Sequence, residues 1–206
     1  IARRDYGSVR ERNLLQPFIN NINSQSLLVK ECCMDGISEM VANKDISFIT
    51  MALEHGVFAM LISLILGTQI QIAGSALMLG LDLLRTLPDA TPYAIQENFI
   101  KFICLPPEFQ HLSFSLKTKM VYIMGEILAN GNTTCLNEIL SNNGIDASIP
   151  LLPCLKREDL NVFGRGILRV SNGIGVNESL LSAIEVLCSI SMDEDLIHSL
   201  SEISER

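Results

Sequence analysis

The sequence of 206 residues contains no tryptophan and only three histidines, and its acidic residues outnumber its basic ones. The formal net charge of −8 argues against nucleic-acid binding, because nucleic-acid-binding proteins gain much of their affinity from clustered Lys and Arg. No cysteine belongs to a C-x-x-C pair, and the histidines are far apart, so no metal or cofactor site is indicated. Converging catalytic groups are also absent, and we expect a protein that is not an enzyme. An acidic protein more readily accepts a basic partner.

The cysteines indicate a reducing environment. All six lie within or beside apolar runs that we expect to be helical, and we interpret them as reduced core residues of an intracellular protein, cytoplasmic or nuclear, of eukaryotic type. The chain begins without an initiator Met or an apolar signal segment, which favours an excerpt of a longer protein. Residues 1–12 carry several arginines, and we expect them to form a basic N-terminal arm.

The longest uncharged run extends from Gly56 to Leu81, which is long enough to cross a bilayer. Its middle, however, carries a turn signal and two glutamine side chains, at Gln69 and Gln71, and hydrocarbon could not satisfy these polar groups. We therefore predict two buried helices here and no membrane partner.

Four polar residues, Glu39, Asp82, Glu126 and Arg169, recur 43, 44 and 43 residues apart, and each lies in a similar pattern of apolar neighbours. Apolar residues elsewhere recur at three and four positions, while β-branched alternation is scarce, so the chain is predicted to be all-α. Periods in the low forties are typical of armadillo and HEAT solenoids, whose repeats bury their apolar faces by stacking.

One repeat can be traced in full as three helices, at Ile46–His55, Val57–Leu66 and Ile72–Leu87. Three helices favour armadillo over HEAT repeats, which have two. Gly56 separates the first two helices, and Gly144 is predicted to do the same two periods later. Pro106 and Pro107 should end a helix and open a loop over residues 108–115. The expected single domain, 13–206, contains repeats at approximately 13–43, 44–88, 89–131 and 132–173, with a partial repeat at 174–206.

The segment 119–129, K-M-V-Y-I-M-G-E-I-L-A, resembles the W-A-L-G-N-I-A segment of armadillo repeats in the importin-α and β-catenin families. The resemblance covers roughly Leu14 to Ser171. It implies a right-handed armadillo-like helical solenoid of about four to five repeats, with a concave groove lined by the third helix of each repeat. In that pattern an aromatic residue and an Asn four residues later stand one turn apart and hold an extended peptide. The matching pairs here are Asp35 and Glu39, Met78 and Asp82, Tyr122 and Glu126, and Arg165 and Arg169.

The chain departs from the family pattern in having no Trp and no Asn at these ladder positions, which argues against a nuclear-import receptor. The charges predict a non-enzymatic interaction scaffold that binds a basic extended peptide or helix of a partner protein against Asp35, Glu39, Asp82 and Glu126. Tyr122 would supply a cation–π contact, and an acidic residue of the partner would meet Arg165 and Arg169.

Three alternatives stay open. The protein could be a regulatory cofactor that embraces a folded chaperone or enzyme through a broad surface. It could be a self-associating module that forms a homodimer through its C-terminal end, where the partial repeat would expose apolar surface. Finally, the four aligned charges could belong to an ordinary solvated helix face.

Overall fold

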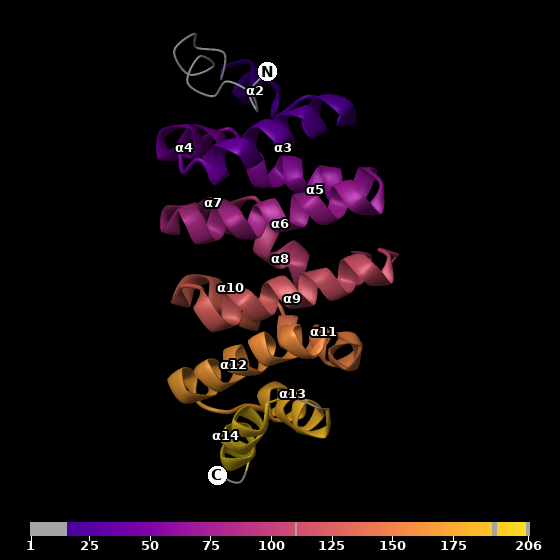
Figure 1. Ribbon diagram of the computed structural model, residues 1–206, viewed down its shortest axis with the longest axis vertical. Helices are drawn as coiled ribbons and strands as arrows, with labels where there is room; N and C mark the ends of the chain where they lie inside the picture. The colour runs from indigo at the N-terminus through magenta and orange to yellow at the C-terminus, as the bar shows by residue number, and fades with distance from the viewer. Residues whose placement is uncertain (1–15, 110, 191–192, 205–206) are drawn as a thin grey trace. The chain divides into compact units, whose positions relative to one another are not determined.

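The computed structural model describes residues 16–109, 111–190 and 193–204, which contain α-helices and short 3-10 helices and no strand. The chain divides into two compact units, Ile1–Phe99 and Ile100–Arg206. Figure 1 labels the helices in chain order. The boundary falls within the predicted domain 13–206, whose unity stays a prediction.

The first unit is built from two long helices and shorter helices that pack against them. Its elements are α2 (Gln16–Asn21), α3 (Leu27–Ala42), α4 (Ile46–Glu54), α5 (Val57–Gly67), α6 (Ile70–Thr86), the 3-10 helix η1 (Pro88–Ala90) and α7 (Thr91–Gln96). The core is apolar and includes Phe48, Phe58 and Phe99, all at most 1% exposed. The rings of Phe58 and Phe99 pack with their centroids 5.0 Å apart. Phe99 also covers Gly80 of α6, where a Cβ would collide with the ring.

The second unit repeats the same plan. Helix α8 (Phe99–Ile103) leads into it, followed by η2 (Pro107–Phe109), α9 (Phe114–Asn130), α10 (Thr133–Ser141), α11 (Gly144–Ser148), η3 (Ile149–Cys154), α12 (Arg157–Ile174), α13 (Glu178–Ser189) and α14 (Glu194–Ser204). Leu196, Leu200 and Ile203 of α14 are buried. The last described helix packs against α12 and α13. The predicted homodimer through this end stays a prediction.

The period predicted from the sequence is confirmed by the helix starts. Helices α3, α6, α9 and α12, the third helix of each repeat, begin at Leu27, Ile70, Phe114 and Arg157. These positions are 43, 44 and 43 residues apart. Each predicted pair therefore occupies the same two positions of its own third helix.

Left-handed residues separate the first and second helices of the repeats. Gly56 (φ 86°), Asn98 (φ 61°) and Asn143 (φ 55°) directly precede α5, α8 and α11. Glycine and asparagine are the residues that adopt this conformation most readily. The prediction for Gly144 was wrong by one residue, because Asn143 makes the turn and Gly144 begins α11.

One further boundary differs from the sequence prediction, and one short segment is not an α-helix. Helix α9 begins at Phe114, before the predicted end of the loop at 115, because the Ser113 hydroxyl caps it by accepting from the Leu116 N–H at 3.4 Å. The segment 149–154 is a 3-10 helix because its prolines lack the N–H groups that an α-helix needs.

Helices α9 and α12 approach each other closely through two glycines. A Cβ added to Gly166 would lie 2.6 Å from the Cβ of Leu128, and one added to Gly125 would lie 3.1 Å from the Cα of Phe163. Hydrogen at these two positions lets the helix backbones come together, and the contact fixes the third helices of the second unit against each other.

The uncharged run from Gly56 to Leu81 is divided between α5 and α6, as predicted. Within the described residues, no single helix is both long and apolar enough to cross a membrane. Helices α4 and α5 together would reach that length, but they are bent by 72° at their junction.

Candidate binding face

The eight predicted contact residues lie on third helices, four in each unit. We call Asp35, Glu39, Met78 and Asp82 of α3 and α6 the first-unit face, and Tyr122, Glu126, Arg165 and Arg169 of α9 and α12 the second-unit face. In the first-unit face, Asp35 is exposed, while Glu39, Met78 and Asp82 are half-buried. No contact with a partner has been observed, so the binding role of all eight residues stays a prediction.

The Glu39 and Asp82 carboxylates of the first-unit face have few competing interactions. Within the described part of the chain, the Glu39 carboxylate has neither a hydrogen bond nor an ion pair. Asp82 lies 3.9 Å from the Arg85 guanidinium, and both side chains are close to half exposed. Such a solvated pair contributes little energy. Both carboxylates are therefore open to a cation from solution.

The second-unit face has a different arrangement, because its carboxylate is already hydrogen-bonded. The Tyr122 hydroxyl donates to one oxygen of Glu126 at 3.1 Å, and the Asn130 amide donates to the other at 3.2 Å. Tyr122 and Glu126, which the sequence places one helical turn apart, are thus hydrogen-bonded to each other. Glu126 would have to give up part of this network to bind a partner's cation.

Arg169 has a structural role in this unit. Its guanidinium donates to the Leu128 carbonyl at 3.1 Å and to the Gly131 carbonyl at 2.7 Å. These carbonyls lie at the C-terminal end of α9, where backbone acceptors lack helical partners and a positive charge is favourable. Arg165 is exposed, and its side chain bonds to nothing in the described chain. Of the two arginines, Arg165 is the one available to a partner.

Sequence reasoning missed Asp159, in the first turn of α12. Burial raises the pKa of its carboxyl, Lys156 lowers it, and the nearby charges of Glu158 and Glu126 raise it further. Glu126 therefore has a second carboxylate close by. The sequence carried no signal for this electrostatic interaction, because Asp159 and Glu126 are brought near each other only by the packing of α12 on α9.

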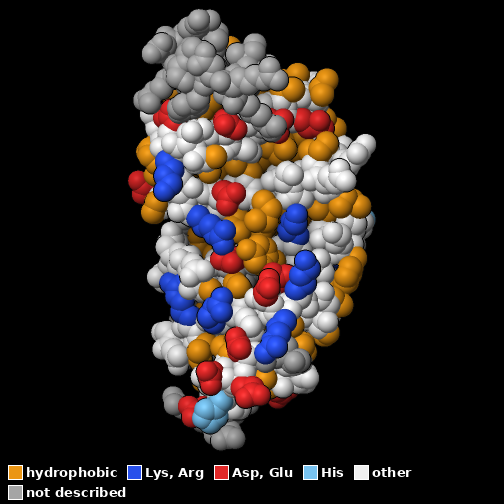
Figure 2. All heavy atoms as spheres, viewed as in Figure 1, with side chains coloured by type: hydrophobic (Ala, Val, Ile, Leu, Met, Phe, Trp, Pro, Cys, Tyr) orange, Lys and Arg blue, Asp and Glu red, His pale blue; other side chains and the backbone are white. Residues whose placement is uncertain are grey.

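The third helices of the two units differ in charge. In α3, one Lys is set against three acidic residues, whereas α9 carries two Lys and one Glu. Figure 2 shows acidic and basic side chains mixed over the visible surface of the second unit. The acidic character expected for the first three repeats is thus strongest on α3.

Among the described residues, no three His, Cys, Asp or Glu side chains could hold a metal ion. Cys33, Cys104 and Cys135 are buried as predicted, and burial raises the pKa of the Cys104 thiol to about 12. The prediction of core positions was wrong for Cys32 and Cys154, which are exposed.

No protein-family model matches the sequence, and no curated protein sequence matches it. Solved structures do match. A designed armadillo repeat protein aligns over 96% of this chain and 84% of its own, with a TM-score of 0.67 and 17% identity. A second, computationally designed for modular peptide recognition, aligns over the same shares with a TM-score of 0.69 and 16% identity. A third, solved in complex with the peptide (KR)4, covers 96% of this chain and 83% of its own, with a TM-score of 0.68 and 16% identity.

These similarities define the fold. The chain is a right-handed armadillo-like helical solenoid, with repeats of 43 and 44 residues.

Proposed function

We propose that this protein is a non-enzymatic scaffold that binds an extended basic segment of a partner protein along the first-unit face. The observation that carries the proposal is the position of Glu39 and Asp82. Each lies twelve residues after the start of its third helix, and each carboxylate is accessible to a cation. A designed protein of the same fold was solved with a peptide of alternating Lys and Arg, which supports the same chemistry here.

The geometry of stacked helices suits an extended partner. Packed helices lie about 8–10 Å apart, and an extended chain advances about 3.3 Å per residue. Two to three peptide residues would therefore pass each repeat, so that basic residues at this spacing could meet Glu39 and then Asp82. Met78 would contact the aliphatic stems of these residues, as long basic side chains keep their methylene groups against apolar surface.

The second-unit face would take a different part of the partner. Arg165 would bind a carboxylate there, while Arg169 holds the end of α9. Tyr122 and Glu126 would contribute only if a cation could replace their mutual hydrogen bond. We accordingly expect substitutions in the first-unit face to affect a basic peptide more strongly.

Fluorescence anisotropy would test this with a labelled peptide of four Lys-Arg dipeptides. Glu39→Gln combined with Asp82→Asn should weaken binding about fivefold to thirtyfold, since each solvated ion pair contributes roughly 0.5–1 kcal/mol. The matched control combines Glu54→Gln with Asp89→Asn, which removes the same charge from exposed residues outside the third helices. The affinity of the control should change less than about twofold.

Equal weakening in the two double variants would show attraction to net charge and would refute a specific face. Unchanged affinity in both would favour the alternative of a broad contact surface. Circular dichroism of each variant should confirm unchanged helix content.

A further inference from the structure

A surface hollow of about 470 Å³ lies in the first unit, at the N-terminal ends of α3 and α6 and the C-terminal end of α5. Its lining residues are Leu27, Glu31, Gly67, Thr68, Gln69 and Ile72. Glu31 precedes Glu39 by eight residues, which is roughly 12 Å along a helix. The hollow is therefore separate from the Glu39 and Asp82 positions of the first-unit face.

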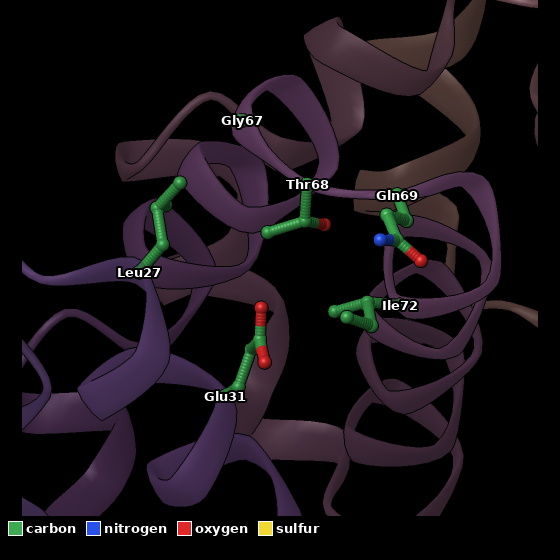
Figure 3. A pocket seen from close by; sticks show the side chains of 6 residues that line it. All are labelled: Leu27, Glu31, Gly67, Thr68, Gln69 and Ile72. Atoms are coloured by element: carbon green, nitrogen blue, oxygen red, sulfur yellow. The ribbon is translucent and has the colours of Figure 1, made fainter.

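Apolar and polar side chains line the hollow in similar measure, and one of them, Glu31, carries a charge. Figure 3 shows the Glu31 carboxylate pointing into the middle of the space, with Leu27 on one side and Ile72 on the other. The methyl groups of Leu27 lie 3.1 Å from the position that a Cβ of Gly67 would occupy. Because Gly67 has no side chain, Leu27 can pack directly against its backbone. The Thr68 hydroxyl is already used, as it donates to the Leu64 carbonyl at 2.6 Å.

Glu31 carries the only formal charge among the residues that line the hollow. Its side chain is half-buried, and it makes no hydrogen bond or ion pair to another residue in the described ranges. A carboxylate with Leu27 on one side and Ile72 on the other favours a cation that brings its own apolar stem. The acidic excess of α3 favours a cation as well.

Exposed apolar side chains surround this part of the chain. Of the seven exposed large hydrophobic residues in the described chain, Leu27, Leu28, Leu66 and Ile70 line the hollow or directly adjoin its lining residues in sequence. Leu28 is 69% exposed and Ile70 is 53% exposed. Figure 2 shows hydrophobic side chains at the surface along the right-hand edge of this unit. Grouped exposed apolar residues are typical of an interaction surface.

We propose that this hollow binds an arginine side chain of a partner peptide, flanked by apolar residues. The methylene stem of the arginine lies between Leu27 and Ile72, and its guanidinium bonds to the Glu31 carboxylate. The flanking residues of the peptide pack against Leu28, Leu66 and Ile70. A guanidinium suits this place because its planar fork pairs with both oxygens of a carboxylate.

The test is a titration of the isotopically labelled chain with the capped peptide Ser-Leu-Arg-Leu-Ser, followed by amide chemical shifts. The shifts of Glu31 and Ile72 should saturate. Replacing arginine by citrulline, its neutral isostere, should weaken binding about tenfold, and Glu31→Gln should have the same effect. The matched control, Glu54→Gln, removes one exposed carboxylate elsewhere in this unit and should leave the affinity unchanged.

The variant carrying Glu39→Gln and Asp82→Asn separates this proposal from the proposed function. It should bind the Leu-Arg-Leu peptide like the wild type while losing affinity for the Lys-Arg peptide. Unsaturated shifts at Glu31 and Ile72, or equal binding of the arginine and citrulline peptides, would overturn the proposal. Shifts of these amides with protein concentration alone would show a second copy of the chain as the occupant, which also overturns it.

Discussion

The close contact between α9 and α12 predicts that alanine will have opposite effects at two glycines of the same helix. At Gly166, an added methyl group would lie 2.6 Å from the Cβ of Leu128 and 3.1 Å from the backbone nitrogen of Ala129. Two carbon atoms that are not bonded to each other repel strongly at 2.6 Å, so the helices would have to move apart. At Gly173, seven residues further along α12, a Cβ would meet nothing within 4 Å.

The magnitude follows from two opposing terms. Overpacking a well-packed contact costs typically 1–3 kcal/mol, whereas Gly→Ala within a helix gains about 1 kcal/mol. Gly166→Ala should therefore lower the free energy of unfolding by up to about 2 kcal/mol. Gly173→Ala lies near the end of the helix, where only part of the propensity gain applies, and it should raise the free energy of unfolding by about 0.5 kcal/mol.

Urea denaturation followed by far-ultraviolet circular dichroism measures both changes. Since repeat proteins need not unfold in a single step, the midpoint and the slope should be compared together, and amide hydrogen exchange in α9 and α12 should locate the effect. If Gly166→Ala were as stable as Gly173→Ala, the close approach of the two helices would be refuted.

Three further predictions test single side chains. Arg169→Ala should lower the free energy of unfolding by about 1 kcal/mol in urea melts, because its bonds to backbone carbonyls are lost, whereas Arg165→Ala should change it by less than about 0.5 kcal/mol. In a thiol-labelling experiment read by mass spectrometry, exposed Cys154 should react in the native state, whereas buried Cys104, with its pKa raised to about 12, should react only on unfolding. Burial raises the pKa of Glu97 although it accepts from backbone N–H groups, so its stabilising contribution is present at low pH and is lost as the pH rises through the folded-state pKa. The unfolding free energy of the wild type should therefore increase relative to that of Glu97→Gln as the pH falls, and a constant difference would contradict this.

The sequence predicted the repeat architecture because its signals are local and periodic. The apolar spacing fixed the helices, and the period of 43 and 44 residues reappears in the starts of α3, α6, α9 and α12. Boundaries were less accurate where one side chain decides them. Because Ser113 caps α9, this helix begins at Phe114, within the loop predicted over residues 108–115. Asn143, rather than Gly144, adopts the left-handed conformation.

The candidate sites were less predictable, because their chemistry depends on contacts between helices distant in sequence. The i and i+4 spacing placed Tyr122 beside Glu126, but nothing in the sequence indicated that Arg169 bonds to the end of α9. The hollow around Glu31 was missed for the same reason. Its walls come from α3 and α6, which are separated by two intervening helices along the chain.

The equivalent carboxylates on the third helices differ in what binding would cost them. A partner's cation at Glu126 must compete with the Tyr122 hydroxyl and the Asn130 amide, so the gain is the difference between new and old hydrogen bonds. At the Glu39 carboxylate the only competitor is water, because no described side chain bonds to its oxygens; the Asn43 amide donates to the Glu39 backbone carbonyl instead. Position along the repeat thus does not by itself define a binding residue. The same register supplies an internal hydrogen bond in α9 and an accessible charge in α3, which is why we assign the basic partner to the first unit.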